Sequence, residues 1–167
     1  MTETARSTQQ FLATYEQEHA TTMKVLHAYP PEKVDLRPHP KCKTAKELAW
    51  VFALERGLGQ RVMTNAFAAG GPSGSPPPAP ETWEEVLAAI EQGHQQFGDL
   101  VRSFSDEQMR EPVAFFVGPK TLGQIPRIDL AWFLLHDQIH HRGQFSIYLR
   151  MADGKVPSIY GPSADEP

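Results

Sequence analysis

The sequence lacks most features of secreted, membrane-spanning or nucleic-acid-binding proteins. Its 167 residues include one cysteine, Cys42, which excludes a disulfide within the chain and is typical of a reducing compartment. No apolar run is long enough to span a bilayer, and the first six residues are too polar for a secretory signal. A net charge of −4 gives no electrostatic basis for binding nucleic acid. We therefore expect a cytoplasmic protein that binds neither membrane nor nucleic acid.

Hydrophobic residues make up 40% of the chain and recur with helical spacing. This content can fill one core, so residues 1–167 are predicted to form a single domain. Two of the helix starts carry capping boxes, Thr44 with Glu47 and Thr82 with Glu85. The predicted helices span about residues 8–28, 44–69, 82–104 and 127–151.

The segments between these helices are predicted to be irregular, with one exception. Residues 70–80, rich in Gly, Ser and Pro, are expected to form a mobile surface loop. Residues 113–119 resemble a short strand and turn, which predicts a small hairpin before the last helix. The tail after Met151 carries aromatic and turn residues and is expected to pack on the domain. The predicted fold class is all-α, a four-helix bundle with a short hairpin.

The last predicted helix contains the residues that say most about chemistry. Residues four apart lie on one face of a helix, so His136 pairs with His140, and Asp137 pairs with His141 on the neighbouring face. Two histidines at this spacing can chelate one divalent metal. The predicted inward stripe also places both imidazoles toward other helices; it comprises Trp132, Phe133, His136, Ile139, His140, Gly143 and Ile147. The alternative is a pair of hydrogen-bonded core histidines.

The segment from His136 to Gln144, with residues 145–150 and 154–166 that follow it, resembles the C-terminal signature of the DinB family of bacterial damage-inducible proteins. The resemblance implies a four-helix bundle that is commonly a homodimer. It also implies a metal held by one histidine of the second helix and two of the last. Related members are S-transferases or isomerases that use a low-molecular-weight thiol and act on small-molecule substrates.

The family's pattern places its first histidine where this chain has Val51, which cannot bind a metal. One turn later, Glu55 interrupts the apolar face of the second helix. A buried carboxylate is costly unless it pairs, protonates or ligates a metal. The predicted ligands are therefore His136, His140 and Glu55, with zinc or nickel as the expected divalent metal. The alternative for Glu55 is a salt bridge to Arg142 or a hydrogen bond to His141.

Other polar side chains are predicted to support this site. Asp137, His141 and Arg142 are expected to surround the ligands, with Arg142 orienting Asp137 or Glu55, or binding an anionic substrate. A cavity lined by Trp50, Phe52 and Trp132 is expected nearby. His19 and His94 also lie on inward stripes, and both are predicted to be core histidines.

An open metal position predicts a metal-dependent enzyme. By resemblance, the metal would activate a thiol such as mycothiol, bacillithiol or glutathione in an S-transferase. A hydrolytic reaction would use Asp137 or Glu55 as general base. The alternative from another class is a metal-free dimeric bundle that serves as a binding or stress-response module without catalysis.

Overall fold

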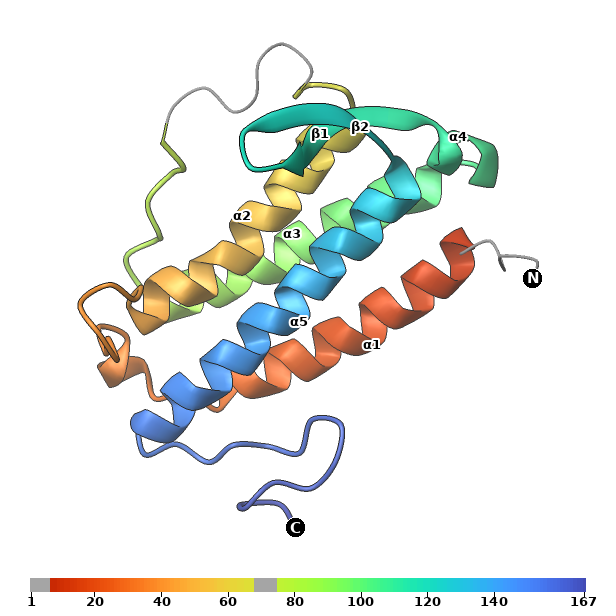
Figure 1. Ribbon diagram of the computed structural model, residues 1–167. Helices are drawn as coiled ribbons and strands as arrows, with labels where there is room; N and C mark the ends of the chain where they lie inside the picture. The colour runs from red at the N-terminus through yellow and green to blue at the C-terminus, as the bar shows by residue number, and fades with distance from the viewer. Residues whose placement is uncertain (1–6, 68–74) are drawn as a thin grey trace.

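Four long helices form a bundle within residues 7–67 and 75–167, the parts of the chain that the computed structural model describes (Figure 1). α1 and α2 each pack against both α3 and α5, and Figure 1 shows α5 in front, between α1 and α2, with α3 behind. The predicted four-helix bundle is confirmed. The four helices are α1 (Thr8–His27), α2 (Ala45–Met63), α3 (Trp83–Ser103) and α5 (Arg127–Met151).

Side-chain caps fix the first turn of three of these helices and of the short α4 (Asp106–Arg110). In each, a serine or threonine oxygen accepts from a backbone N–H three residues on, and the Glu or Gln there bonds back. This satisfies two backbone donors that a helix start otherwise leaves unpaired. The boxes predicted at Thr44 and Thr82 are confirmed.

The second helix is shorter than predicted. α2 ends at Met63, and Asn65 two residues later has a φ of 60°, a left-handed conformation that cannot continue the helix. Ala69, where the sequence predicted the end, lies outside the described residues, as does most of the glycine-rich part of the predicted loop, residues 70–74. The bounds predicted for the last helix, 127–151, are confirmed.

The predicted hairpin is also confirmed. β1 (Pro112–Gly118) pairs antiparallel with β2 (Thr121–Pro126), and Lys120 adopts a φ of 58° in the turn between them. Figure 1 shows the hairpin across the end of the bundle where α5 begins. At the opposite end, a 3-10 turn (Pro31–Lys33) follows α1.

Two apolar clusters fill the bundle, and buried polar residues lie between them along the helices. One cluster lies toward the hairpin and includes Phe11, Tyr15, Val62, Phe97 and Leu134. The other lies toward the opposite end and includes Leu26, Phe52, Ile90, Phe145 and Leu149. The polar layer comprises Glu18, His19, Thr22, Glu55, Arg56, His94, Gln138 and Arg142. Polar groups in such a layer need partners, so their contacts decide how the helices are rotated.

The inward face predicted for the last helix is wrong. Phe133 and Ile147, both predicted to face inward, are 49% and 60% exposed. The buried side of α5 instead includes Leu134, Gln138 and Phe145. Apolar residues lie on nearly every side of α5, so its hydrophobic pattern does not select one face. None of the helices in the described residues is both long and apolar enough to cross a membrane.

The C-terminal tail packs on the bundle, as predicted. Asp165 binds the Arg150 guanidinium at 2.6 Å and accepts from the backbone N–H of Val156 at 2.8 Å. The hydroxyl of Tyr160 donates to Glu18 at 2.8 Å and accepts from Arg142 at 2.6 Å. The tail therefore adds partners to the polar layer.

Candidate metal site

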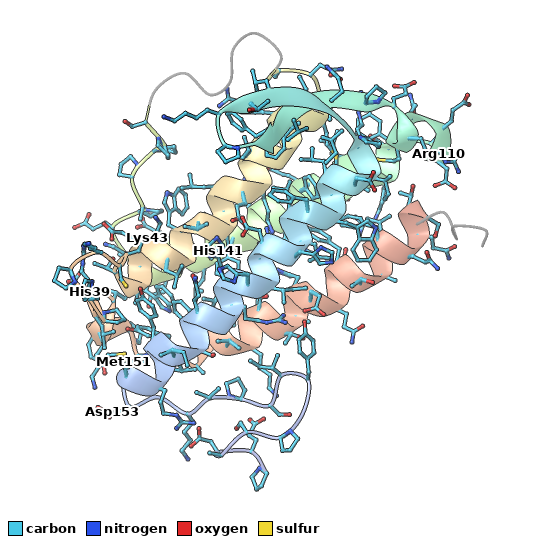
Figure 2. All side chains as sticks on the ribbon, in the orientation of Figure 1. His39, Lys43, Arg110, His141, Met151 and Asp153 are labelled. Carbon is cyan, nitrogen blue, oxygen red and sulfur yellow. The ribbon has the colours of Figure 1, made fainter. Side chains whose placement is uncertain are left out.

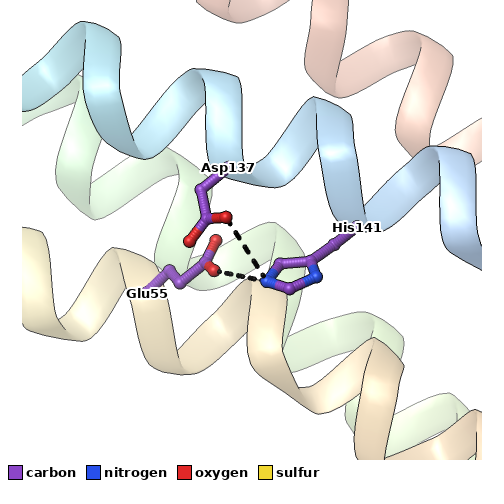
Figure 3. Close-up of side chains that lie close together, drawn as sticks. All are labelled: Glu55, Asp137 and His141. Atoms are coloured by element: carbon purple, nitrogen blue, oxygen red, sulfur yellow. Dashed lines mark ion pairs between the residues drawn. The ribbon is translucent and has the colours of Figure 1, made fainter.

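Glu55, Asp137 and His141 come together between α2 and α5 (Figure 3). His141 Nε2 lies 3.1 Å from Glu55 Oε1 and 3.8 Å from Asp137 Oδ1. One ligand atom from each residue lies within 4.8 Å of the other two. Figure 2 shows His141 on α5 at the level of α2, near the middle of the bundle. These three residues are called the carboxylate–histidine cluster below.

Helix geometry explains how two segments far apart in sequence build this cluster. Asp137 and His141 are four residues apart on α5, so they share one face, and this face is turned toward α2. Exposure falls from the rim inward: the side chains of Asp137, His141 and Glu55 are 40%, 19% and 10% exposed. His141 Nδ1 lies 3.2 Å from the Gln144 amide oxygen, which orients the ring. The cluster is thus reachable from solvent on the Asp137 side.

The Glu55 carboxyl and the His141 imidazole each bind a proton more tightly than the same side chain does in water. Burial raises the pKa of the Glu55 carboxyl to about 7, against the lowering effect of the His141 beside it. The hydrogen bond to Glu55 raises the pKa of the His141 imidazole, while its burial acts in the opposite direction. A cation that bound here would displace such a proton, so its affinity would rise with pH.

One observation indicates that the side chains of the carboxylate–histidine cluster could hold a divalent cation. Glu55 Oε2 is buried, and no described residue donates a hydrogen bond to it, although the other oxygen binds His141; the nearby Asp137 carboxylate adds repulsion to a negative charge at Glu55. A buried carboxylate oxygen without a partner is costly, and a cation is the group that would compensate it most. Carboxylate oxygens and an imidazole nitrogen are ordinary ligands of Zn²⁺, Mn²⁺ and Fe²⁺.

The structure places the predicted ligands differently. Glu55 lies in the cluster, but His136 and His140 are both exposed, so the prediction that they point toward other helices is wrong. His140 Nε2 contacts the Gln144 amide nitrogen at 2.9 Å, and the His136 ring lies 5.9 Å from that of Trp132. The neighbouring pair, Asp137 and His141, faces α2 in their place.

Arg142 does not support the cluster, contrary to prediction. It is 2% exposed and faces α1, where it forms an ion pair with Glu18 at 2.7 Å. Its guanidinium also donates to the Glu18 carbonyl and to the Tyr160 hydroxyl. Arg142 therefore joins α5, α1 and the C-terminal tail. The alternative of a hydrogen bond between Glu55 and His141 is confirmed.

His19 and His94 are buried and hydrogen-bonded, as predicted for core histidines. Their rings stack 3.6 Å apart; His19 Nε2 pairs with Glu91 at 2.9 Å and His94 Nε2 with Glu16 at 2.8 Å. Burial lowers the pKa of His94 to about 4 and, together with Arg56, lowers that of His19. Both imidazoles are therefore neutral at physiological pH. The role of Arg56, which bonds His19, Gln138 and the Ile90 carbonyl, was missed from sequence.

A groove runs along α2 beside the cluster. Its volume is about 510 Å³, and Glu55 forms part of its wall. Of the three residues predicted to line a cavity, Trp50 lines this groove, Phe52 is fully buried in the core, and Trp132 packs instead against the apolar cluster toward the hairpin. The lining comprises Trp50, Ala53, Leu54, Glu55, Gly57, Leu58, Arg61, Ser75, Pro76 and Pro77.

Fold and cluster together define a helical-bundle protein with a candidate metal site between two helices. The DinB superfamily pattern matches residues 14–145, and the chain belongs to that superfamily. The sequence is 26% identical to the uncharacterized protein YrdA of Bacillus subtilis (strain 168) over 157 residues, 93% of this chain and 89% of YrdA.

Solved structures share the fold. A DinB-like protein from Bacillus cereus superposes with a TM-score of 0.71 at 21% identity, covering 91% of this chain and 97% of its own. YfiT from Bacillus subtilis, described as a probable metal-dependent hydrolase with an unusual four-helix bundle topology, gives a TM-score of 0.64 at 14% identity, with 89% of each chain covered. At these identities the likeness establishes the bundle alone.

Proposed function

We propose that this protein is a divalent-metal-dependent enzyme that uses the carboxylate–histidine cluster to hold its metal. The observation that carries the proposal is the buried Glu55 carboxylate: no described residue donates a hydrogen bond to its Oε2, and one of its oxygens lies within 4.8 Å of ligand atoms of Asp137 and His141. An ordinary core would replace such a carboxylate or pair both of its oxygens. The description of the structural neighbour YfiT as a probable metal-dependent hydrolase supports the same class.

The three residues take different parts in this proposal. Glu55 and His141, the more buried pair, would hold the cation, and Asp137 at the exposed rim would complete the set or accept a proton from a nucleophile. When bound, a divalent cation supplies Lewis acidity, which lowers the pKa of water or a thiol and polarises a substrate oxygen. Zinc and nickel remain the predicted metals, and two carboxylates with one imidazole also suit manganese.

The proposed reaction is attack of a nucleophile on an electrophilic small molecule. Water as nucleophile gives a hydrolase, the class named for YfiT. A low-molecular-weight thiol gives the S-transferase that the family resemblance implies. Assays of one electrophile panel with and without glutathione, mycothiol or bacillithiol separate the two, because only the transferase yields thiol-dependent product.

Metal stoichiometry in matched variants tests the proposal. Protein purified without a histidine tag is analysed for its elements and titrated with zinc, nickel and manganese. His141→Ala is expected to abolish binding, whereas His140→Ala, the adjacent exposed histidine on the same helix, is expected to leave it unchanged. If metal binding is lost in His136→Ala and in His140→Ala but kept in His141→Ala, the ligands predicted from sequence are correct and the carboxylate–histidine cluster is not the metal site. Activity should follow metal content across the set.

Absence of stoichiometric metal in the titrated parent protein would favour the metal-free binding or stress-response module. In that case, the hydrogen bond between Glu55 and His141 would be the cluster's whole role. The homodimer also remains a prediction, and sedimentation equilibrium at micromolar concentration tests it. Three apolar side chains on α5, Phe133, Ile147 and Met151, are exposed and available for such a contact.

A further inference from the structure

The floor of the groove is one face of α2, apolar except for Arg61 at its end. Trp50, Leu54, Gly57 and Arg61 recur at spacings of three or four and therefore share one face of α2. The opposite wall is the chain that follows residue 75, which Figure 1 shows running beside α2 toward α3. The Trp50 indole N–H donates to the Pro77 carbonyl at 2.9 Å, which ties this wall to the helix.

The groove lining contains one carboxylate, Glu55, and one guanidinium, Arg61. Glu55, a member of the carboxylate–histidine cluster, lies in its wall. Arg61 also lines it, and this exposed guanidinium makes no ion pair or hydrogen bond with any other described residue. Glu55 and Arg61 are six positions apart on α2, which is about 9 Å along the helix axis. An apolar stretch with a free cation on one side is complementary to an apolar molecule that carries an anionic group.

Gly57 keeps the floor of the groove open. A Cβ built at Gly57 meets no atom within 4 Å, so packing does not require glycine there. Gly59, two residues on, is different, because its Cβ would lie 2.7 Å from Phe97 and 2.8 Å from Leu134. Glycine within a helix is destabilising relative to alanine. What Gly57 provides at this cost is unfilled space in the groove beside Glu55.

We propose that this groove is the substrate-binding site and that it takes an organic monoanion with an apolar body, its anionic group at Arg61 and its reactive end toward Glu55. The proposal rests on the proposed function for the identity of the reacting end, but not for the binding itself. A second copy of this chain or an apolar peptide could also occupy an apolar groove. The Arg61 guanidinium, which pairs with no described residue, favours the small anion, because a wholly apolar partner would displace water from that charge without pairing it.

Octanoate and its uncharged analogue octanamide are suitable probes for calorimetric titration. The parent protein is expected to bind octanoate more tightly than octanamide. Arg61→Gln should weaken octanoate by at least about tenfold, the loss expected for one charged hydrogen bond, and leave octanamide unchanged. Equal affinity of the parent for both probes, or an unchanged octanoate affinity in Arg61→Gln, would overturn the assignment of the anion to Arg61.

A second test fills the floor of the groove with a larger side chain at Gly57. Gly57→Leu should weaken both probes by at least about tenfold, because its side chain occupies their space. Gly143→Leu on α5 is the matched control, since a Cβ there also meets nothing within 4 Å. It should bind both probes as the parent does, and thermal melts should show both variants folded. Unchanged probe affinity in folded Gly57→Leu would overturn the proposal, and a changed sedimentation coefficient in that variant would assign the groove to a second copy.

Metal titration of the same variants separates this proposal from the function on which it rests. Gly57→Leu and Arg61→Gln should bind metal with the parent's stoichiometry, because neither residue belongs to the cluster. If the protein binds metal but does not bind octanoate more tightly than octanamide, the groove is not the proposed anion site, and the proposed metal-dependent function still stands. If the protein binds octanoate selectively but binds no metal, the groove is supported as an anion site, and the proposed metal-dependent function is refuted.

Discussion

Replacing Glu55 by glutamine is expected to stabilise the metal-free protein while removing its metal site. The change keeps the shape of a side chain that is 10% exposed and removes its charge. In the parent, no described residue donates a hydrogen bond to the buried Glu55 Oε2, and burial, with the Asp137 carboxylate nearby, raises the pKa of the carboxyl from 4.5 to about 7. The folded protein therefore resists ionising this group, whereas the unfolded chain does not.

The pKa difference sets both the size and the pH dependence of the effect. One pKa unit corresponds to about 1.4 kcal/mol, so the ionised carboxylate costs about 3 kcal/mol of unfolding free energy above pH 7. Because the folded pKa is raised, the folded state binds more protons, and the cost grows from about pH 4.5 to pH 7. Glutamine removes this cost. The stabilisation should reach about 1–3 kcal/mol at pH 8, after some loss in the bond to His141, and shrink toward zero at pH 4.5.

Urea denaturation of chelator-treated protein at pH 4.5 and pH 8 measures this difference. Glu81→Gln, which removes an exposed carboxylate, is the control and should stay within about 0.5 kcal/mol of the parent at both pH values. Metal titration should show no binding to Glu55→Gln. A Glu55→Gln variant less stable than the parent at pH 8, with a neutral control, would refute the argument that an uncompensated carboxylate is buried here.

Three further outcomes are expected. Val51→His places an imidazole one turn before the candidate ligand on α2 and should tighten metal binding by about tenfold; an unchanged or weaker affinity by calorimetry would contradict that placement. Arg142→Met leaves the buried Glu18 carboxylate without its 2.7 Å partner and should lower unfolding free energy by about 3–5 kcal/mol, with metal stoichiometry unchanged. Because the pKa of His94 is lowered from 6.5 to about 4, its burial costs nothing above pH 6.5 and costs about 3 kcal/mol near pH 4. Over that range the parent and His27→Gln should both lose unfolding free energy relative to His94→Gln in urea denaturation, and a constant difference between His94→Gln and the parent would contradict this.

The sequence by itself determined the helices, the hairpin and the family. Local chemistry carries this information: a threonine followed three residues later by glutamate starts a helix wherever the rest of the chain lies, as at Thr44 and Thr82. It also identified Glu55, because a carboxylate in an apolar stripe is costly in any packing that buries the stripe. The resemblance to the DinB family, confirmed over residues 14–145, rests on the same kind of local pattern.

Only the tertiary structure decided which face of α5 meets α2. The two candidate pairs, His136 with His140 and Asp137 with His141, differ by one residue, or about 100° of helix rotation. Apolar residues surround α5, so its hydrophobic pattern could not choose between them. The buried ion pair of Arg142 with Glu18 selects the second pair, because an arginine buried against α1 turns Asp137 and His141 toward α2. Such a partner lies 124 residues away in sequence and cannot be recognised until the helices are packed.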